Sequence, residues 1–420
     1  MLPTLSRPAR RYLLHTTLLT FGLSISALFF NLLLVALGYA ERTVALPLVG
    51  ELSLLGLLNS LPVLVAGLSS LPIWWLVSVV GLRPALLAGA LLHAVSLLGV
   101  ALWTAPLPLL VSVALGGPAA VLFQVSAAPY MLRHSSPVER DVLFALSAGL
   151  NIGVGGFGSL VGGFVPGLAA ALFALPPQSA AAYRVTFVAA AALTALAVLP
   201  LLYAERQAPS AVPKATPPAR RVRLGVLVRA ALAAWPFVIS PLLISCGAAL
   251  LIPFLSLYLR ERYNAPDAAL GVLFAAVGVA TGTATLLAPL LSRHLGKMGS
   301  VVLTQTLAIP CLLLLGVAPT LWLAGAVALV RGALMNMAAP LYDAYAMEQT
   351  PAVARPVVIG LINGAFSVGY LVGPLVSAQV QRVYGFGPLF IATALFYACA
   401  ASANALIFLR RGASPRSELS

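Results

Sequence analysis

Few side chains that could do chemistry lie inside the long apolar runs of this sequence, and Arg331 and Asp343 are the charged ones in the run 321–347. A charge at the centre of a membrane-spanning helix costs about 2.5 to 3.5 kcal/mol on insertion scales, so we expect Arg331 to face a cavity and not lipid. The two residues are twelve positions apart, which is about 18 Å along a helix and about 120° around it. They are therefore not expected to pair. The counterpart of Arg331 is predicted to be an anionic group on a ligand or the backbone carbonyls of a neighbouring helix, and a structural arginine is the alternative.

Other polar side chains extend this candidate site. Asn336 lies seven positions before Asp343 and shares its face of the helix, while Tyr342 lies about 20° from Arg331 on the helical wheel. Asp343 is the candidate proton carrier, and an interfacial carboxylate near Glu348 is the alternative. The remaining candidate substrate-binding residues are amides inside other apolar runs, namely Asn31, Gln124, Asn151 and Asn363. Each of these amides could equally cross-link helices.

These residues need helices that span a membrane to position them. Of 420 residues, 61% are hydrophobic and only 8% charged, and the mean hydropathy is +1.03, whereas an ordinary soluble domain carries about 25% charged residues. Apolar runs of at least about 18 residues recur along the chain, and each can cross a hydrocarbon core of about 30 Å as a helix. The lipid bilayer is therefore the predicted surrounding, and the strands of a membrane barrel would show shorter, alternating segments.

Splitting the runs at Pro, Gly and charged residues predicts twelve spans and two halves. The first run begins after Arg7, Arg10 and Arg11 and is too long for a cleavable signal segment, so it is expected to be retained. The predicted domains are an N-terminal six-helix half (1–203), a Pro-rich cytoplasmic linker (204–230) and a C-terminal six-helix half (231–420). The predicted spans are 13–39, 51–77, 84–104, 107–131, 142–167, 184–203, 231–259, 268–291, 299–317, 321–347, 356–379 and 388–409.

The distribution of charge predicts the topology. With both termini in the cytoplasm, 18 of the 24 Lys and Arg residues fall on the cytoplasmic side. This bias is what the positive-inside rule requires, so the net charge of +14 reflects orientation in a cytoplasmic membrane and not nucleic-acid binding.

An internal repeat supports the two halves. A shift of 215 positions places glycine on glycine, tyrosine on tyrosine and arginine on arginine without a gap. The two halves are therefore predicted to be pseudo-symmetric copies with a solute site near the midplane, as in many transporters. The matched pairs include Gly56 and Gly271, Gly81 and Gly296, Gly117 and Gly332, Tyr130 and Tyr345, Arg140 and Arg355, Gly149 and Gly364, and Gly158 and Gly373.

No pattern in the sequence favours an enzyme. The three cysteines lie in separate apolar runs and the four histidines in different segments, so no metal site, cofactor or nucleophilic cluster is predicted. A non-transporting receptor is the other alternative, but it would need a large patterned loop, and the only long polar stretch is the Pro-rich linker.

Two pairs of short motifs indicate conformational elements. The loop after the second span keeps Gly81 and Arg83, and its copy after the eighth span keeps Gly296 and Lys297. The fifth and eleventh spans carry small residues that let helices approach closely, and a proline that relaxes one backbone hydrogen bond. These residues are Gly158, Gly162 and Gly163 in the fifth span and Gly369, Gly373 and Pro374 in the eleventh. Plain helix packing is the alternative explanation.

From residue 13 to 409 the chain resembles the major facilitator superfamily. The loop motifs are similar to that superfamily's Gly-Asp-Arg-Gly-basic signature, although Ser78 and Arg293 stand near the place of its acidic residue. The glycine–proline motif is similar to that of antiporter members. The resemblance implies an all-α membrane fold of twelve transmembrane helices, with the first, fourth, seventh and tenth spans lining a central cavity.

The predicted function is secondary active transport by a monomer. The first hypothesis is efflux of a drug-like or metabolite molecule, for which proton antiport through Asp343 is the candidate coupling. Uptake of a small solute by symport or facilitated diffusion is the alternative, and an anionic solute is the candidate in that case.

Overall fold

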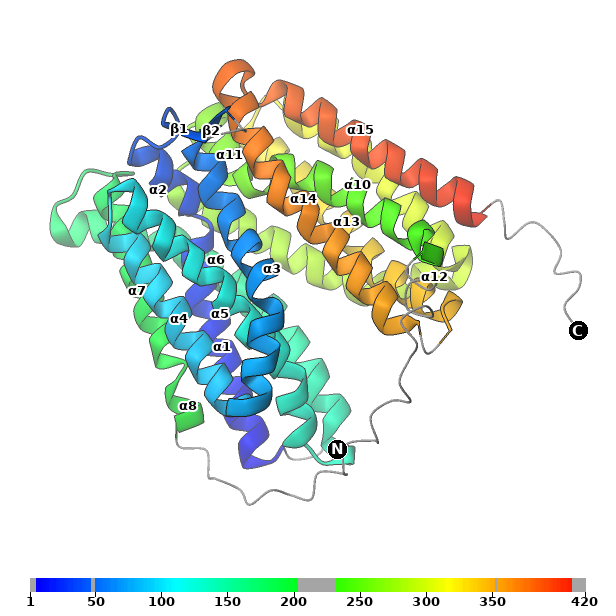
Figure 1. Cartoon of the computed structure of the whole chain (residues 1–420). Coiled ribbons are helices and arrows are strands. Elements are labelled where there is room, and N and C mark those ends of the chain that lie inside the picture. The colour runs from blue at the N-terminus through cyan, green and yellow to red at the C-terminus, as the bar shows by residue number, and fades with distance from the viewer. Residues whose placement is uncertain (1–4, 47–49, 203–231, 352–353, 410–420) are drawn as a thin grey trace, which may run out of the picture. The chain divides into compact units, whose positions relative to one another are not determined.

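The structure is a computed structural model that describes residues 5–46, 50–202, 232–351 and 354–409 (Figure 1). The predicted linker 204–230 and both termini lie outside the described residues. The helices before the linker are α1 (Arg7–Ala27), α2 (Phe30–Ala36), α3 (Leu54–Val80), α4 (Leu82–Leu102), α5 (Pro106–Arg133), α6 (Pro137–Phe173), α7 (Ala180–Leu196) and α8 (Leu199–Leu202). Those after it are α10 (Trp235–Leu251), α11 (Leu255–Tyr263), α12 (Asp267–Val317), α13 (Leu321–Gln349), α14 (Arg355–Tyr384) and α15 (Gly387–Asn404). A 3-10 turn (Ile252–Phe254) joins α10 to α11, and a π-turn (Ala405–Leu409) follows α15.

The helices match the predicted spans within a few residues. Within the described residues, eleven continuous helical segments are long and apolar enough to cross a membrane. One of them, α12, has 51 residues, which as a straight helix would measure about 76 Å, more than twice a hydrocarbon core. Gly296 interrupts it with φ 70° and ψ 166°, so α12 supplies two spans and the predicted all-α fold of twelve spans is confirmed.

The two loop glycines adopt nearly the same backbone conformation. Gly81, between α3 and α4, has φ 91° and ψ 166°, close to the values at Gly296. A positive φ of this kind is unfavourable for residues with a Cβ atom, which explains why both repeats use glycine at the turn. The repeat seen in the sequence is thus also a repeat of local structure.

Backbone contacts divide the chain into two compact units. The first comprises Met1–Thr216 with Ser256–Val279, and the second Pro217–Leu255 with Ala280–Ser420. The segment 256–279 therefore groups with the first unit, although the predicted domain boundaries assign it to the second half. The reason is close backbone contact: a Cβ built on Gly163 of α6 would lie 2.7 Å from Cα of Gly271 in α12.

Equivalent helices pack in equivalent ways within each unit. In the first unit α1 packs against α6 and α7, and in the second unit α10 packs against α14 and α15. A Cβ on Gly162 would lie 2.6 Å from the Ile25 carbonyl oxygen, and one on Gly369 would lie 2.5 Å from the Ser245 carbonyl carbon. The glycine motifs of α6 and α14 therefore act in helix packing, because only a missing side chain allows backbones this close.

Two features of the first unit depart from the sequence analysis. The second span begins three residues late, because Gly50–Ser53 (β2) pairs as an antiparallel strand with Thr43–Leu46 (β1). The first span is also interrupted between Ala27 and Phe30, and α2 ends before Gly38, which has φ 78°. An apolar run shows that a segment can cross a membrane, but it does not show where its helix is interrupted.

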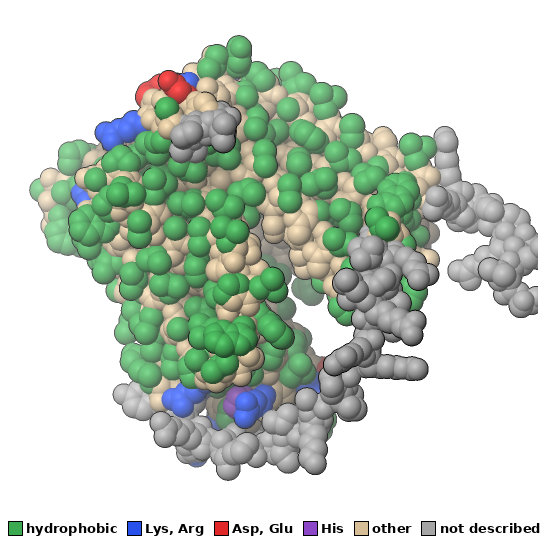
Figure 2. Space-filling view, in the orientation of Figure 1, with side chains coloured by type: hydrophobic (Ala, Val, Ile, Leu, Met, Phe, Trp, Pro, Cys, Tyr) green, Lys and Arg blue, Asp and Glu red, His purple; other side chains and the backbone are tan. Residues whose placement is uncertain are grey.

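The outward faces of the helices are apolar. Leu71, Trp74 and Trp75 of α3 are 79%, 62% and 63% exposed, which is unusual for a soluble protein. Figure 2 shows hydrophobic side chains over the faces of α3 and α4, with Lys and Arg near the helix ends. This surface fits a lipid environment, and the chain is a multi-pass membrane protein.

Candidate functional site

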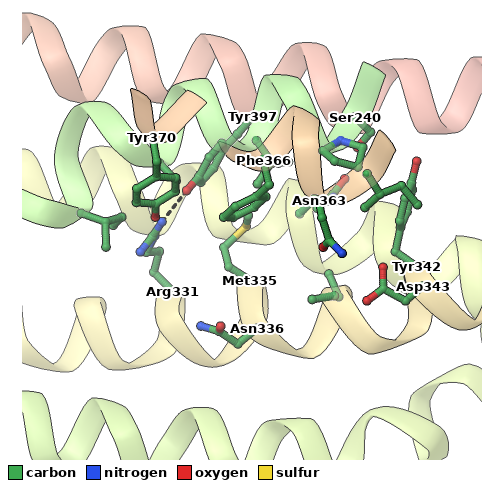
Figure 3. A pocket seen from close by; sticks show the side chains of 18 residues that line it. Ser240, Arg331, Met335, Asn336, Tyr342, Asp343, Asn363, Phe366, Tyr370 and Tyr397 are labelled. Atoms are coloured by element: carbon green, nitrogen blue, oxygen red, sulfur yellow. Dashed lines mark hydrogen bonds between the residues drawn. The ribbon is translucent and has the colours of Figure 1, made fainter. Parts of the chain in front are cut away.

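A cavity of about 300 Å³ lies inside the second unit, among α10, α12, α13, α14 and α15 (Figure 3). This volume is at the lower end of the range for small-molecule sites. From α13 it is lined by Arg331, Met335, Asn336, Ala338, Ala339, Tyr342 and Asp343. The other helices contribute Ser240, Pro241, Ile244, Ala248, Ile252, Gln305, Ile362, Asn363, Phe366, Tyr370 and Tyr397.

The lining of α13 follows from its helical periodicity. Arg331, Met335 and Tyr342 are four and seven residues apart, so they share a face, and Asp343 lies on the adjacent side of the helix. Asn336 lies beside them, where its Nδ2 donates to the Gly332 carbonyl oxygen at 2.8 Å. Four candidate residues of the sequence analysis thus line the cavity from this helix.

One end of the cavity is cationic. Arg331 is only 8% exposed, its Nη2 donates a hydrogen bond to the Tyr397 hydroxyl, and its guanidinium lies 5.6 Å from the centre of the Tyr397 ring. Its Nε is buried and has no hydrogen-bond partner among the described residues. No ion pair joins Arg331 to a carboxylate within that part of the chain. Among the residues that the structure describes, its hydrogen-bond partner is thus a phenol.

The opposite end of the cavity is anionic and adjoins a second hollow. Asp343 lines the cavity about 18 Å along α13 from Arg331. Together with Asn363 and Ile362 it also borders an adjoining hollow of about 250 Å³. Figure 3 shows Asp343 and Tyr342 at the end away from Arg331 and Tyr397. The cavity is therefore elongated, with unlike charges at its two ends.

The middle of the cavity combines apolar and hydrogen-bonding walls. Met335 and Phe366 lie between the two charged ends in Figure 3. Behind the wall, Asn404 is fully buried and its Nδ2 donates to Ser240 Oγ at 2.8 Å and to Gln305 Oε1 at 3.0 Å. This amide joins α15, α10 and α12 and holds the two lining side chains in place.

Asn363 and Tyr342 complete the predicted residues at this cavity. The Tyr342 hydroxyl donates to the Phe237 carbonyl oxygen at 3.0 Å, which anchors the ring to α10. Asn363 is exposed and lines both hollows. The structure thus brings Arg331, Asn336, Tyr342, Asp343 and Asn363 together around one cavity.

The candidates of the first unit are arranged differently. Asn31 is 4% exposed, and its Oδ1 accepts a hydrogen bond of 2.7 Å from Asn59 Nδ2. Asn151 Oδ1 accepts a hydrogen bond of 2.6 Å from Thr20 Oγ1, which links α6 to α1. Gln124 is exposed on α5. Two of these three amides are therefore engaged by neighbouring helices.

The loop motifs lie at helix ends. The guanidinium of Arg83 donates to the carbonyl oxygens of Leu201 and Leu202 at 2.8 and 2.7 Å, at the end of α8. Lys297 forms an ion pair with Glu348 of α13. The basic residues of the two motifs thus have different partners, one a pair of backbone carbonyls and the other a carboxylate.

Sequence reasoning missed two tyrosines and one carboxylate. Tyr370 and Tyr397 lie inside predicted spans, so a search for every phenol in an apolar run would have found them. Asp267, at the start of α12, is 8% exposed; it forms an ion pair with Arg260 and accepts a hydrogen bond of 3.2 Å from the Tyr183 hydroxyl. Its partners fix α7, α11 and α12 within the first unit, and it is a structural carboxylate.

The described part of the chain holds no group of three or more His, Cys, Asp or Glu residues that could bind a metal. Cys246, Cys311 and Cys399 are free thiols.

Comparison with known proteins places this fold. The sequence model of the Major Facilitator Superfamily matches residues 14–330 and 237–420. A search of curated proteins finds no match. Among solved structures, a bacterial homolog to the human lysosomal transporter Spinster, in an inward-facing and unoccupied conformation, has a TM-score of 0.77 at 16% identity and covers 98% of this chain and 100% of its own. The nucleoside transporter NupG has a TM-score of 0.70 at 14% identity and covers 96% of this chain and 99% of its own. These neighbours show that the chain has the fold of the two transporters.

Proposed function

The chain belongs to the Major Facilitator Superfamily, and from that premise we propose that it moves a small organic solute by alternating access, with the cavity of the second unit as part of its binding site. The observation that carries the proposal is the cavity itself. It is of ligand size, mostly apolar, and has a few convergent polar groups, which is the usual character of a small-molecule site.

The proposed substrate-binding residues are Arg331, Asn336, Tyr342 and Asn363, with Tyr370 and Tyr397 added. Asn31 and Asn151 are proposed to act as helix cross-links, because their amides already have partners on neighbouring helices. Gln124 is retained as a contact with solute because its side chain is exposed.

We further propose that the protein is a monomer of the cytoplasmic membrane with both termini in the cytoplasm. The support is the excess of Lys and Arg on one predicted side. The loop residues Gly81, Arg83, Gly296 and Lys297 and the motifs of α6 and α14 are proposed to adjust during transport, because turns and glycine contacts allow helices to shift with little steric cost.

Efflux of a drug-like or metabolite molecule in exchange for protons is the proposed direction and coupling. Asp343 lines the cavity and is exposed to it, so it could exchange a proton as the solute enters or leaves. Uptake by symport or facilitated diffusion is the second candidate, and the buried Arg331 favours an anionic solute in that case.

The proposal is tested by solute-dependent proton flux in proteoliposomes that contain pyranine, using a panel of drugs, nucleosides and organic anions. We expect at least one solute to move protons, and Asp343→Asn to stop the proton flux. Glu348→Gln is the matched control, because Glu348 lies on the same helix but pairs with Lys297 at its exposed end. Solute movement without protons in the wild type would replace antiport by facilitated diffusion, and no movement of any solute would contradict the transport proposal.

A further inference from the structure

We propose that the Arg331 end of the cavity is an anion-recognition subsite, and that the transported solute has a single anionic head group on an apolar or aromatic body. This inference rests on the proposed transport function, because it names the class of solute for that same cavity. The anionic group would be a carboxylate or a phosphate, since both match the planar donors of a guanidinium.

The first argument is the charge balance around Arg331. An arginine is always ionised and is rarely buried without an anionic partner. Arg331 is 8% exposed, yet no ion pair connects it to a carboxylate among the described residues. Asp343, the carboxylate on the same wall, lies about 18 Å away along the helix. The compensating negative charge is therefore best supplied by a molecule that enters the cavity.

The second argument is the geometry of the donors. Only one hydrogen bond to protein is formed by this guanidinium, from Nη2 to the Tyr397 hydroxyl, and Nε is left without a partner in the described chain. Tyr397 is fully buried, so it holds the guanidinium in a fixed orientation at the cavity wall. Figure 3 shows the Tyr370 ring directed toward the same guanidinium. The subsite thus has unused donors on a positioned cation, which is the arrangement expected for binding an anion.

The third argument is the rest of the lining. Met335, Phe366, Ile244 and Ile252 provide an apolar wall beyond the arginine. Asp343 at the far end repels a second negative charge. A solute with one anionic head and an apolar body avoids this repulsion, whereas a solute with an anionic group at each end does not.

The inference is tested by equilibrium binding to the purified full-length protein in nanodiscs. The probes share one apolar body and differ in the head group: phenylbutyrate, phenylbutyl phosphate, phenylbutyramide and phenylbutylamine. We expect at least one anion to bind about tenfold more tightly than the neutral amide, since hydrogen bonds to charged groups are about twice as strong as neutral ones. The two anions distinguish a carboxylate from a phosphate as the preferred head. Equal binding of anion and amide by the wild type would overturn the inference.

A matched pair of variants tests the role of Arg331 without removing it. Met335 lines the cavity one helical turn from Arg331, so Met335→Glu places a carboxylate within reach of the guanidinium, while Met335→Gln has the same size and no charge. We expect Met335→Glu to abolish the preference for the anion and Met335→Gln to keep it. An unchanged preference in Met335→Glu would assign the anion to another site.

Direct removal of the charge gives a second measurement. Arg331→Gln should bind the anion and the amide equally, whereas Arg382→Gln, at the exposed end of α14, should behave like the wild type. If Arg331→Gln does not fold, the Met335 pair decides the question. A solute that is transported without any anion preference would leave the proposed function standing and reject the subsite. Selective binding of the anion without transport of any solute would support the anion subsite and reject the proposed transport function.

Discussion

The helices α5 and α13 occupy matching positions in the two sequence repeats, but the charged residues that line the cavity come from α13. The bounds of α5, shifted by 215 positions, reproduce those of α13 within one residue. Arg331, Tyr342 and Asp343 nevertheless correspond to Gly116, Ala127 and Ala128 in the first repeat. The repeated fold therefore supplies the scaffold twice, while the chemistry described here is present in one copy.

Polar side chains join helices in both units, and in the second unit some of them also line the cavity. In the first unit the amides of Asn31 and Asn151 are bonded to side chains of other helices. In the second unit Asn363 and Asp343 face a cavity. Asparagine thus joins helices in both units, and Asn363 in addition lines a cavity of the second unit.

The largest expected effect concerns the close glycine contacts between helices that both units contain. Gly162→Ala and Gly369→Ala should each lower the free energy of unfolding by about 1 to 3 kcal/mol, because the new methyl group would meet the backbone of α1 or α10. Gly149→Ala and Gly364→Ala are matched controls on the same helices with open space around them, and they should not be destabilising. Thermal unfolding in detergent measures all four. Similar melting temperatures in all four variants would reject the shared glycine contact.

The next effect separates the two units by function. Asn363→Ala should raise the KM for transport about three- to tenfold, because it removes a polar group from the cavity. Asn151→Ala should change KM less than about twofold and lower the melting temperature instead, since it breaks the bond to Thr20. Transport kinetics in proteoliposomes measure the first and thermal unfolding the second. If Asn363→Ala lowered the melting temperature and Asn151→Ala raised the KM, the proposed difference between the two units would be wrong.

A smaller effect concerns the buried amide pair of the first unit. A double-mutant cycle of Asn31→Ala and Asn59→Ala should give a coupling free energy of about 0.6 kcal/mol, which is typical of side-chain hydrogen bonds between membrane helices. Unfolding of the wild type, both single variants and the double variant in mixed micelles provides the four values. A coupling free energy indistinguishable from zero would mean that the hydrogen bond between the two amides does not stabilise the fold.

The smallest effect is expected for Lys297 and Glu348 in the second unit. Their side chains are 32% and 58% exposed, so their coupling should be about 0.2 to 1 kcal/mol at low salt and should disappear at high salt. The Asn31–Asn59 coupling should not respond to salt, because neither amide carries a charge. The same double-mutant cycle at two ionic strengths checks both statements. A coupling of Lys297 and Glu348 that resists salt would indicate a stronger role for this ion pair.

Much of the fold could be predicted because its signals are local. Apolar runs gave the spans, and the shift of 215 positions predicted that Gly81 and Gly296 are equivalent, as their backbone angles confirm. The breaks near Leu28 and the hairpin β1–β2 were missed, because a hydropathy pattern does not record where a helix is interrupted.

The sequence by itself determined which side of α13 is polar, because the positions of Arg331, Tyr342 and Asp343 on a helix depend only on their spacing. Only the tertiary structure decided what that side faces. Tyr397 is 66 residues from Arg331 in sequence, and Ser240 and Gln305 come from two other helices. Helix spacing cannot predict such neighbours, because they depend on how the surfaces of separate helices pack together. For the same reason, packing alone decided that Asn31 and Asn151 bond to neighbouring helices while Asn363 lines a cavity.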